Sequence, residues 1–133
     1  MPFSYKFESK KDHALISLEG SLLSGFDGKE LIDTVDKDLK DHKNFIVDMG
    51  KLNHLSSEGF NVLLNILTRS RNHDGETILC NLSTHIQSLF IMTKLSHIFT
   101  ITGDKKEAIE KLKELQNKET GEKSVETEDR KKK

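Results

Sequence analysis

Residues 45–67 read FIVDMGKLNHLSSEGFNVLLNIL, and this stretch decides the fold. An apolar, partly β-branched run at 44–49 is typical of a buried strand. From Phe60 onward, apolar residues recur at spacings of three and four, which favours a helix with one apolar face. Polar residues and Gly59 separate the two runs. The stretch therefore predicts a strand, a loop at 52–56 and a helix.

Strand and helix patterns alternate on both sides of this stretch. Strands are predicted at 3–8, 14–20, 77–82 and 98–101, and further helices begin near Lys29, Ser83 and Asp104. A short polar turn joins the first two strands, whereas helices separate the later ones, as parallel strands require. Asp104 and Glu107 have the spacing of a capping box. We predict an α/β fold: a single domain with a mostly parallel sheet of about five strands and four helices.

Composition narrows the classes of partner. Lysine and arginine total 21 against 22 acidic residues, so the net charge of -1 gives no bulk attraction to nucleic acid or to an anionic membrane. No apolar run approaches the roughly 20 residues that span a bilayer, and the first residues lack the apolar core of a signal peptide. We expect a cytoplasmic protein with no nucleic-acid partner and no membrane insertion.

The end of the chain differs from the rest. Residues 117–133 are almost entirely charged or small and polar, with Val125 as the only aliphatic residue. Such a segment buries too little apolar surface to offset the entropy lost on ordering. We therefore place the domain at 1–116 and predict a charged, disordered tail at 117–133.

Known sequence motifs for catalysis and metal binding do not match this chain. The segment 20–27, GSLLSGFD, has the glycine spacing of a phosphate-binding loop, but Phe26 and Asp27 replace the lysine and hydroxyl that hold phosphate and metal. The six histidines form no pair at helical ligand spacing, and Cys80 lies in an apolar strand as a small buried hydrophobe. Neither serine of LSSEG has the preceding glycine of a nucleophile elbow. No catalytic residue, metal site or cofactor is predicted, and the chain is not expected to be an enzyme.

The two adjacent serines have different expected roles. Ser56 is placed to cap the helix that follows, Glu58 complements the positive helix end, and Gly59 permits close approach to the sheet. These roles do not need Ser57. Its hydroxyl is expected to point outward at the first helical position, where a modifying enzyme could reach it.

These residues carry a family resemblance. The stretch 45–67, followed by TILCNLSTHIQSLFIMTKLSHIFTI at 77–101 and a final helix, resembles the STAS domain of bacterial anti-sigma factor antagonists. The resemblance covers about residues 3–115. It implies the same α/β fold.

The resemblance also points to a phosphorylation site. In that family a strand aspartate, matched here by Asp48, precedes the motif Asp-Ser-Ser-Gly at the start of the second helix. Aligned on Gly59, the phosphorylated serine of the family corresponds to Ser57. Ser56 stands in place of the motif aspartate and Glu58 in place of its second serine. Ser56 is the alternative acceptor.

The implied function is a partner switch. An unphosphorylated antagonist of this family binds an anti-sigma factor that is also a serine kinase of the histidine-kinase-like ATPase class, and thereby releases a sigma factor. Phosphorylation by that kinase ends the association, and a metal-dependent serine phosphatase restores it. The expected state of the antagonist is a monomer or a weak dimer.

The partner surface is expected around the phosphorylation site, on the loop before the first helix and on the second helix. Its candidate residues are Gly25, Phe26, Asp27, His54, Leu55, Ser56, Glu58, Gly59, Asn61 and Asn65. Two other interpretations stay open. The domain could be an accessory or scaffold subunit, as in a lipid or anion transporter complex, or it could bind a nucleotide or small ligand in a cleft near 25–28 and Leu55.

Overall fold

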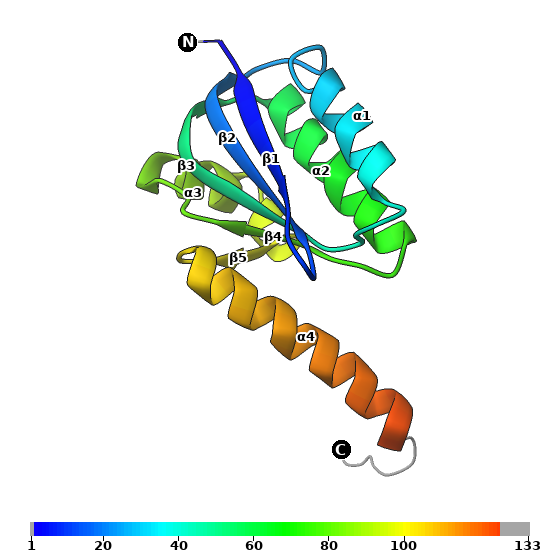
Figure 1. The fold of residues 1–133 in the computed structure, drawn as a ribbon. Coiled ribbons are helices and arrows are strands. Elements are labelled where there is room, and N and C mark those ends of the chain that lie inside the picture. The colour runs from blue at the N-terminus through cyan, green and yellow to red at the C-terminus, as the bar shows by residue number, and fades with distance from the viewer. Residues whose placement is uncertain (1, 126–133) are drawn as a thin grey trace.

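Five strands form one sheet in the computed structural model, which describes residues 2–125 (Figure 1). The strands are β1 (Ser4–Ser9), β2 (Ala14–Leu22), β3 (Phe45–Leu55), β4 (Thr77–Cys80) and β5 (Thr100–Thr102). They lie in chain order across the sheet. β1 is antiparallel to β2, and all other neighbours are parallel. The predicted opening hairpin and mostly parallel sheet are confirmed.

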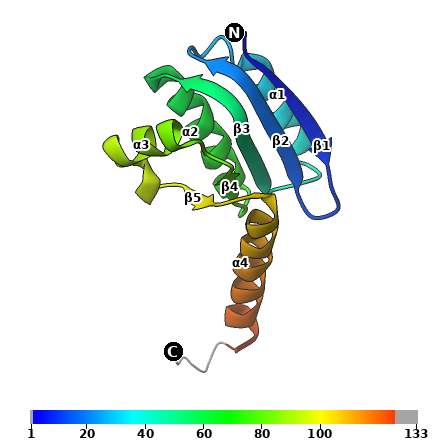
Figure 2. The same cartoon turned by 90° about the vertical axis from the view of Figure 1, so that its left-hand side faces the viewer.

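Three α-helices and one short 3-10 helix connect the parallel strands, and a fourth α-helix follows the last strand. They are α1 (Lys29–Asp38), α2 (Ser57–Asn72), α3 (Thr84–Met92), η1 (Leu95–His97) and α4 (Lys105–Val125). Helices α1 and α2 lie side by side against one face of the sheet (Figure 1). Helix α4 packs against the other face, on β3, β4 and β5 (Figure 2). Each face of the sheet therefore has its own apolar cluster.

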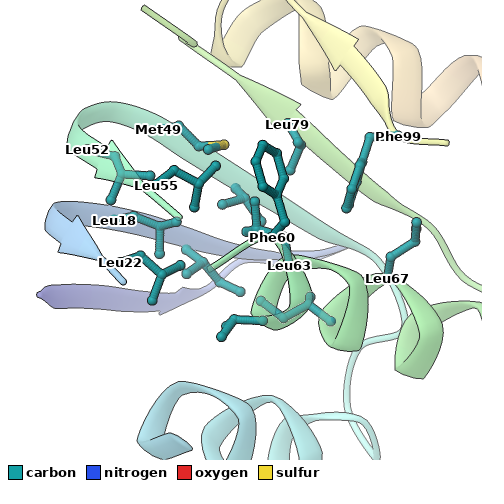
Figure 3. Packing of buried hydrophobic residues seen from close by; sticks show 14 of the residues in the cluster. Leu18, Leu22, Met49, Leu52, Leu55, Phe60, Leu63, Leu67, Leu79 and Phe99 are labelled. Atoms are coloured by element: carbon teal, nitrogen blue, oxygen red, sulfur yellow. The ribbon is translucent and has the colours of Figure 1, made fainter. Parts of the chain in front are cut away.

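The larger cluster fills the space between the sheet and helices α1 to α3. Figure 3 shows Phe60, Leu63 and Leu67 projecting from α2 toward the sheet. Phe90 on α3 is fully buried and meets Phe60 edge-on, with ring centroids 4.9 Å apart. Its ring also meets that of Phe99, at 5.7 Å. These edge-to-face contacts tie the first turn of α2 to α3 and to the segment before β5.

Strand β3 is longer than predicted. We expected it to end at residue 49 and to be followed by a loop, but it continues to Leu55 and stays paired with β2 as far as Leu22. The pairing shifts register at two points on the way. Such irregularities interrupt the alternation of buried and exposed residues by which a strand is recognised. The loop prediction for residues 52–55 is wrong for that reason.

Later boundaries also differ from prediction. The strand expected at 77–82 ends at Cys80. The strand expected at 98–101 begins at Thr100, because η1 continues to His97 and Ile98 forms its C-cap. Helix α4 continues to Val125, beyond the domain end expected at residue 116. Glutamate, lysine and glutamine are good helix formers, so the composition of this segment favours continuation of the helix beyond Leu115. Residues 126–133 of the expected tail lie outside the described residues.

Cys80 is buried in β4, as predicted. The side chain is 0% exposed, and burial, with a smaller contribution from Asp48, raises the pKa of its thiol to about 12. The reactive thiolate is therefore scarce at neutral pH. We expect iodoacetamide at about pH 8 to leave the folded protein unmodified and to alkylate Cys80 in urea, as intact-mass spectrometry can show. Rapid labelling of the folded protein would contradict this burial.

His42 links the β1–β2 turn to the end of α1. Its Nδ1 lies 2.9 Å from Oδ2 of Asp38, and its Nε2 lies 2.7 Å from the backbone oxygen of Lys10. Burial lowers the pKa of His42. The hydrogen bonds to Lys10 and Asp38 and the negative charges of Asp38 and Asp41 together outweigh burial, so the pKa is raised from its ordinary value.

A raised pKa makes the contribution of His42 to stability depend on pH. The contribution is fully present below the unfolded pKa of about 6.5 and is lost as the pH rises through the folded value. We therefore expect His42→Gln to lower the melting temperature more at about pH 5.5 than at about pH 8.5. Burial chiefly lowers the pKa of His13, and the charge of His42 lowers it further, so both proteins in this comparison carry His13→Gln to remove that coupling. An equal loss at both pH values would rule out this role.

Candidate functional site

Two chain junctions meet at the carboxyl ends of β2 and β3. β2 ends at Leu22 and β3 at Leu55, and these two residues are paired in the sheet. The chain then enters a loop at 23–28 before α1 in one case, and passes through Ser56 into α2 in the other. In open α/β sheets, partners and ligands meet the fold at such strand ends.

Ser56 caps α2 and also joins the two junctions. Its Oγ accepts a hydrogen bond from the Gly59 N–H at 3.1 Å and donates one to the Leu23 carbonyl at 2.7 Å. Its backbone N–H donates to the Leu22 carbonyl at 3.2 Å. The predicted cap is therefore confirmed, and the Ser56 hydroxyl is occupied by structural contacts.

Ser57 occupies the first position of α2, and its side chain is exposed. The cap contacts belong to Ser56, so the Ser57 hydroxyl stands apart from the hydrogen bonds that hold the junction. Free backbone N–H groups and the helix dipole make the space around the first turn electropositive. A phosphate group on Ser57 would be compatible with that potential.

Glu58 holds the loop before α1 against the start of α2. Its Oε1 accepts a hydrogen bond from the Gly25 N–H at 3.2 Å. Within the loop, Asp27 Oδ2 accepts from the Leu23 N–H and Ser24 Oγ accepts from the Asp27 N–H, each at 3.2 Å. These contacts fix the loop beside Ser57.

Gly59 allows the first turn of α2 to approach β2 closely. A Cβ atom added at Gly59 would lie 2.3 Å from the Leu22 carbonyl oxygen and 2.7 Å from Leu55 Cδ1. No side chain fits in that space without moving the backbone. Gly59 is therefore needed for packing and is buried beneath the site.

Apolar side chains stand out from the loop beside Ser57. Phe26 is 85% exposed and Leu23 is 50% exposed. We call the exposed residues Leu23, Gly25, Phe26, Ser57 and Glu58 the Ser57 surface. Exposed apolar groups beside a polar site are typical of protein interfaces. Sequence analysis missed Leu23, because the residue directly follows the buried Leu22 and no alternation of buried and exposed residues at the end of β2 marks it as exposed.

The other candidate residues lie around or beneath the Ser57 surface. Leu55 is 7% exposed and packs in the core, so it supports the site from inside. His54 is exposed on β3, with Nδ1 at 3.2 Å from Ser21 Oγ. Asn61 and Asn65 lie on the exposed face of α2, and the Asn65 amide donates to the Asn61 carbonyl at 3.0 Å. Their role in binding a partner stays a prediction.

Membrane-spanning helices and metal sites are absent from the part of the chain that the structure describes, residues 2–125 for the backbone. No helix there is long and apolar enough to cross a membrane. Among residues 2–115, whose side chains the structure describes, no group of three or more histidine, cysteine or acidic side chains is arranged to hold a metal ion.

Comparison with known families identifies the domain. A family model described as STAS domain matches residues 6–108. The chain belongs to the STAS domain family. This confirms the resemblance drawn from the strand, loop and helix at 45–67.

One relative of this STAS domain is named after the anti-sigma factor antagonists. The Bordetella bronchiseptica protein named "Putative anti-sigma factor antagonist BtrV" is 30% identical over 69 residues. The match covers 52% of this chain and 60% of BtrV, less than two thirds of that relative.

Solved structures with the same fold also include such antagonists. The Bacillus cell fate determinant SpoIIAA in its phosphorylated form has a TM-score of 0.64 and 19% identity, covering 81% of this chain and 98% of SpoIIAA. An anti-sigma factor antagonist from Mycobacterium paratuberculosis has a TM-score of 0.71 and 13% identity, covering 84% of this chain and 94% of the other. At these identities the likeness establishes a shared fold.

Proposed function

We propose that this STAS domain is an anti-sigma factor antagonist whose binding is switched by phosphorylation of Ser57. The observation that carries the proposal is the exposed Ser57 hydroxyl at the start of α2, beside the exposed Phe26 and Leu23 side chains. Anti-sigma factor antagonists among the relatives support the same class of function.

In the proposed cycle, the unphosphorylated domain binds an anti-sigma factor that is also a serine kinase of the histidine-kinase-like ATPase class. Binding releases a sigma factor. The kinase then phosphorylates Ser57 and the complex separates, until a metal-dependent serine phosphatase removes the phosphate. The domain itself acts by binding in the cytoplasm, and its partners carry out the chemistry.

The contacts of the two serines favour Ser57 over Ser56 as the acceptor. Phosphorylation of Ser56 would remove its 2.7 Å hydrogen bond to the Leu23 carbonyl and place a charged group in the helix cap. Phosphorylation of Ser57 breaks neither contact. The fold is therefore expected to tolerate a phosphate on Ser57 but to be disturbed by one on Ser56.

The phosphate would act on the interface and leave the fold intact. It adds about -1.5 to -2 charges and three acceptor oxygens at an electropositive helix end. In a complex, the same group would be desolvated beside the carboxylate of Glu58, which already accepts a hydrogen bond from the loop. Unpaired, desolvated charge at an interface opposes binding strongly.

The proposal can be tested by titrating the unmodified full chain into the host kinase bound to its sigma factor. We expect saturable binding measured by calorimetry, together with release of the sigma factor on size-exclusion chromatography. If the chain bound neither the kinase nor the kinase–sigma complex, that result would contradict the antagonist role and favour an accessory or scaffold subunit.

A substitution on α2 tests whether the helix face belongs to the interface. Asn61 is exposed one turn after Ser57, and we expect Asn61→Arg to weaken kinase binding about tenfold through added bulk and charge. Asn72→Arg is the matched control. Asn72 is the last residue of the same helix, about 20 Å along the helix axis from Ser57, so this variant should bind the kinase normally. Unchanged calorimetric affinity for both variants would exclude this face of α2.

A further inference from the structure

A second concave site lies on the face of the sheet away from α1 and α2. It is a groove of about 480 Å³ between the β1–β2 turn, the start of β3 and helix α4. Leu15 and Ile46, which are paired between β2 and β3, and Leu112 on α4 form its floor. This volume falls within the range of small-molecule sites, about 300–1,000 Å³.

The floor is apolar and comes from rigid elements. Leu15, Ile46 and Leu112 are all nearly buried and belong to the smaller core cluster. Ile109, one turn before Leu112 on α4, is 36% exposed and leaves an apolar flank open to solvent. A hydrocarbon chain placed there would be removed from water on both sides.

The rim is cationic. Lys11 in the turn and Lys105 and Lys113 on α4 line the groove. Among residues 2–115, whose side chains the structure describes, no ion pair engages these three lysines, whereas Lys10 beside them is paired with Glu8 at 3.0 Å. Asp12 is the one carboxylate among the described lining residues. The charge of the rim is therefore complementary to an anion.

The groove is separate from the Ser57 surface. Leu15 lies near the amino end of β2, and Leu22 lies at its carboxyl end beside Ser56. Seven residues of extended strand place them about 23 Å apart. Helix α4, which supplies one wall of the groove, packs on the opposite face of the sheet from α2 (Figure 2).

We propose that this groove binds an anionic amphiphile of the fatty-acid class, with the acyl chain on the apolar floor and the carboxylate among Lys11, Lys105 and Lys113. The apolar floor distinguishes this ligand from a simple inorganic anion, and the unpaired lysines distinguish it from a neutral hydrocarbon. The proposal is independent of the partner switch at Ser57.

The test is an amide-resolved NMR titration of the full chain with octanoate and decanoate, each below its micelle-forming concentration. We expect saturable shifts at His13, Leu15 and Ile109, with decanoate binding about tenfold more tightly because two more methylenes are buried. Octanol, which has the same chain as octanoate without its charge, should bind at least tenfold more weakly. Inorganic phosphate should give no saturable shift at the floor residues.

Two variants distinguish the groove from general surface charge. Lys113→Glu should weaken decanoate binding at least tenfold, whereas Lys106→Glu, on the same helix but away from the groove, should bind as the parent does. Ile109→Gln should reduce the gain in affinity that the two extra methylenes of decanoate give over octanoate. The proposal would be overturned by any one of three results: phosphate binds as tightly as decanoate, the two lysine variants have equal effects on decanoate binding, or decanoate gives no saturable shift.

Discussion

Ser57→Asp is expected to weaken binding to the kinase partner at least a hundredfold, or about 2.8 kcal/mol. The substitution places a carboxylate at the exposed first position of α2, beside Glu58 and the apolar side chain of Phe26. Binding would desolvate both carboxylates together at the interface, where like charges oppose association. In the free protein the added charge lies at the positive helix end, so the fold should lose no stability.

Control variants separate charge at the site from damage to the helix. Ser57→Ala should bind the kinase without release, because it cannot be phosphorylated. Thr68→Asp adds the same charge to an exposed position three turns along α2 and should bind normally. Ser56→Ala should lose about 1 kcal/mol of stability with its cap while Ser57 stays phosphorylatable. Calorimetric affinities for Ser57→Asp and wild type that agree within threefold would contradict the switch.

Phe90→Ala is expected to have the largest effect on stability, a loss of about 3–5 kcal/mol in the free energy of unfolding. The ring is fully buried and contacts the edges or faces of Phe60 and Phe99. Its removal leaves a cavity against the first turn of α2, four residues after the Ser56 cap. Urea denaturation followed by circular dichroism measures the loss.

Ile91→Ala is the matched control for Phe90→Ala. Ile91 is the next residue of α3 and is 65% exposed, so its truncation should change stability by no more than about 0.5 kcal/mol. Equal effects of the two substitutions would show that the aromatic contacts do not hold α2 in place.

The order of elements could be predicted from sequence because the periodicity changes along the chain. The helical spacing from Phe60 and the caps at Ser56, Ser83 and Asp104 are local signals, and the structure contains each of these contacts. The end of β3 could not be predicted in this way. Its pairing with β2 passes through register shifts that only the neighbouring strand reveals.

In the candidate site, too, local features could be predicted from the sequence and tertiary contacts could not. The separate roles of Ser56 and Ser57 follow from positions in a helix cap, which are local. The hydrogen bond from the Gly25 N–H to Glu58 joins residues 33 positions apart, and neither sequence segment contains a sign of it. The basic groove is likewise assembled by tertiary structure, because Lys11 and Lys113 line the same groove only after α4 has packed on the sheet.

Site-resolved phosphopeptide mass spectrometry tests the central proposal most directly. The full chain is incubated with the host kinase and ATP, and trypsin then releases the peptide between Lys51 and Arg69, which contains both Ser56 and Ser57. Fragmentation of that peptide assigns the phosphate to one serine. We predict phosphate on Ser57 and none on the same peptide from Ser57→Ala. Phosphate on Ser56 would contradict the assignment, and phosphate on neither serine would contradict the switch itself.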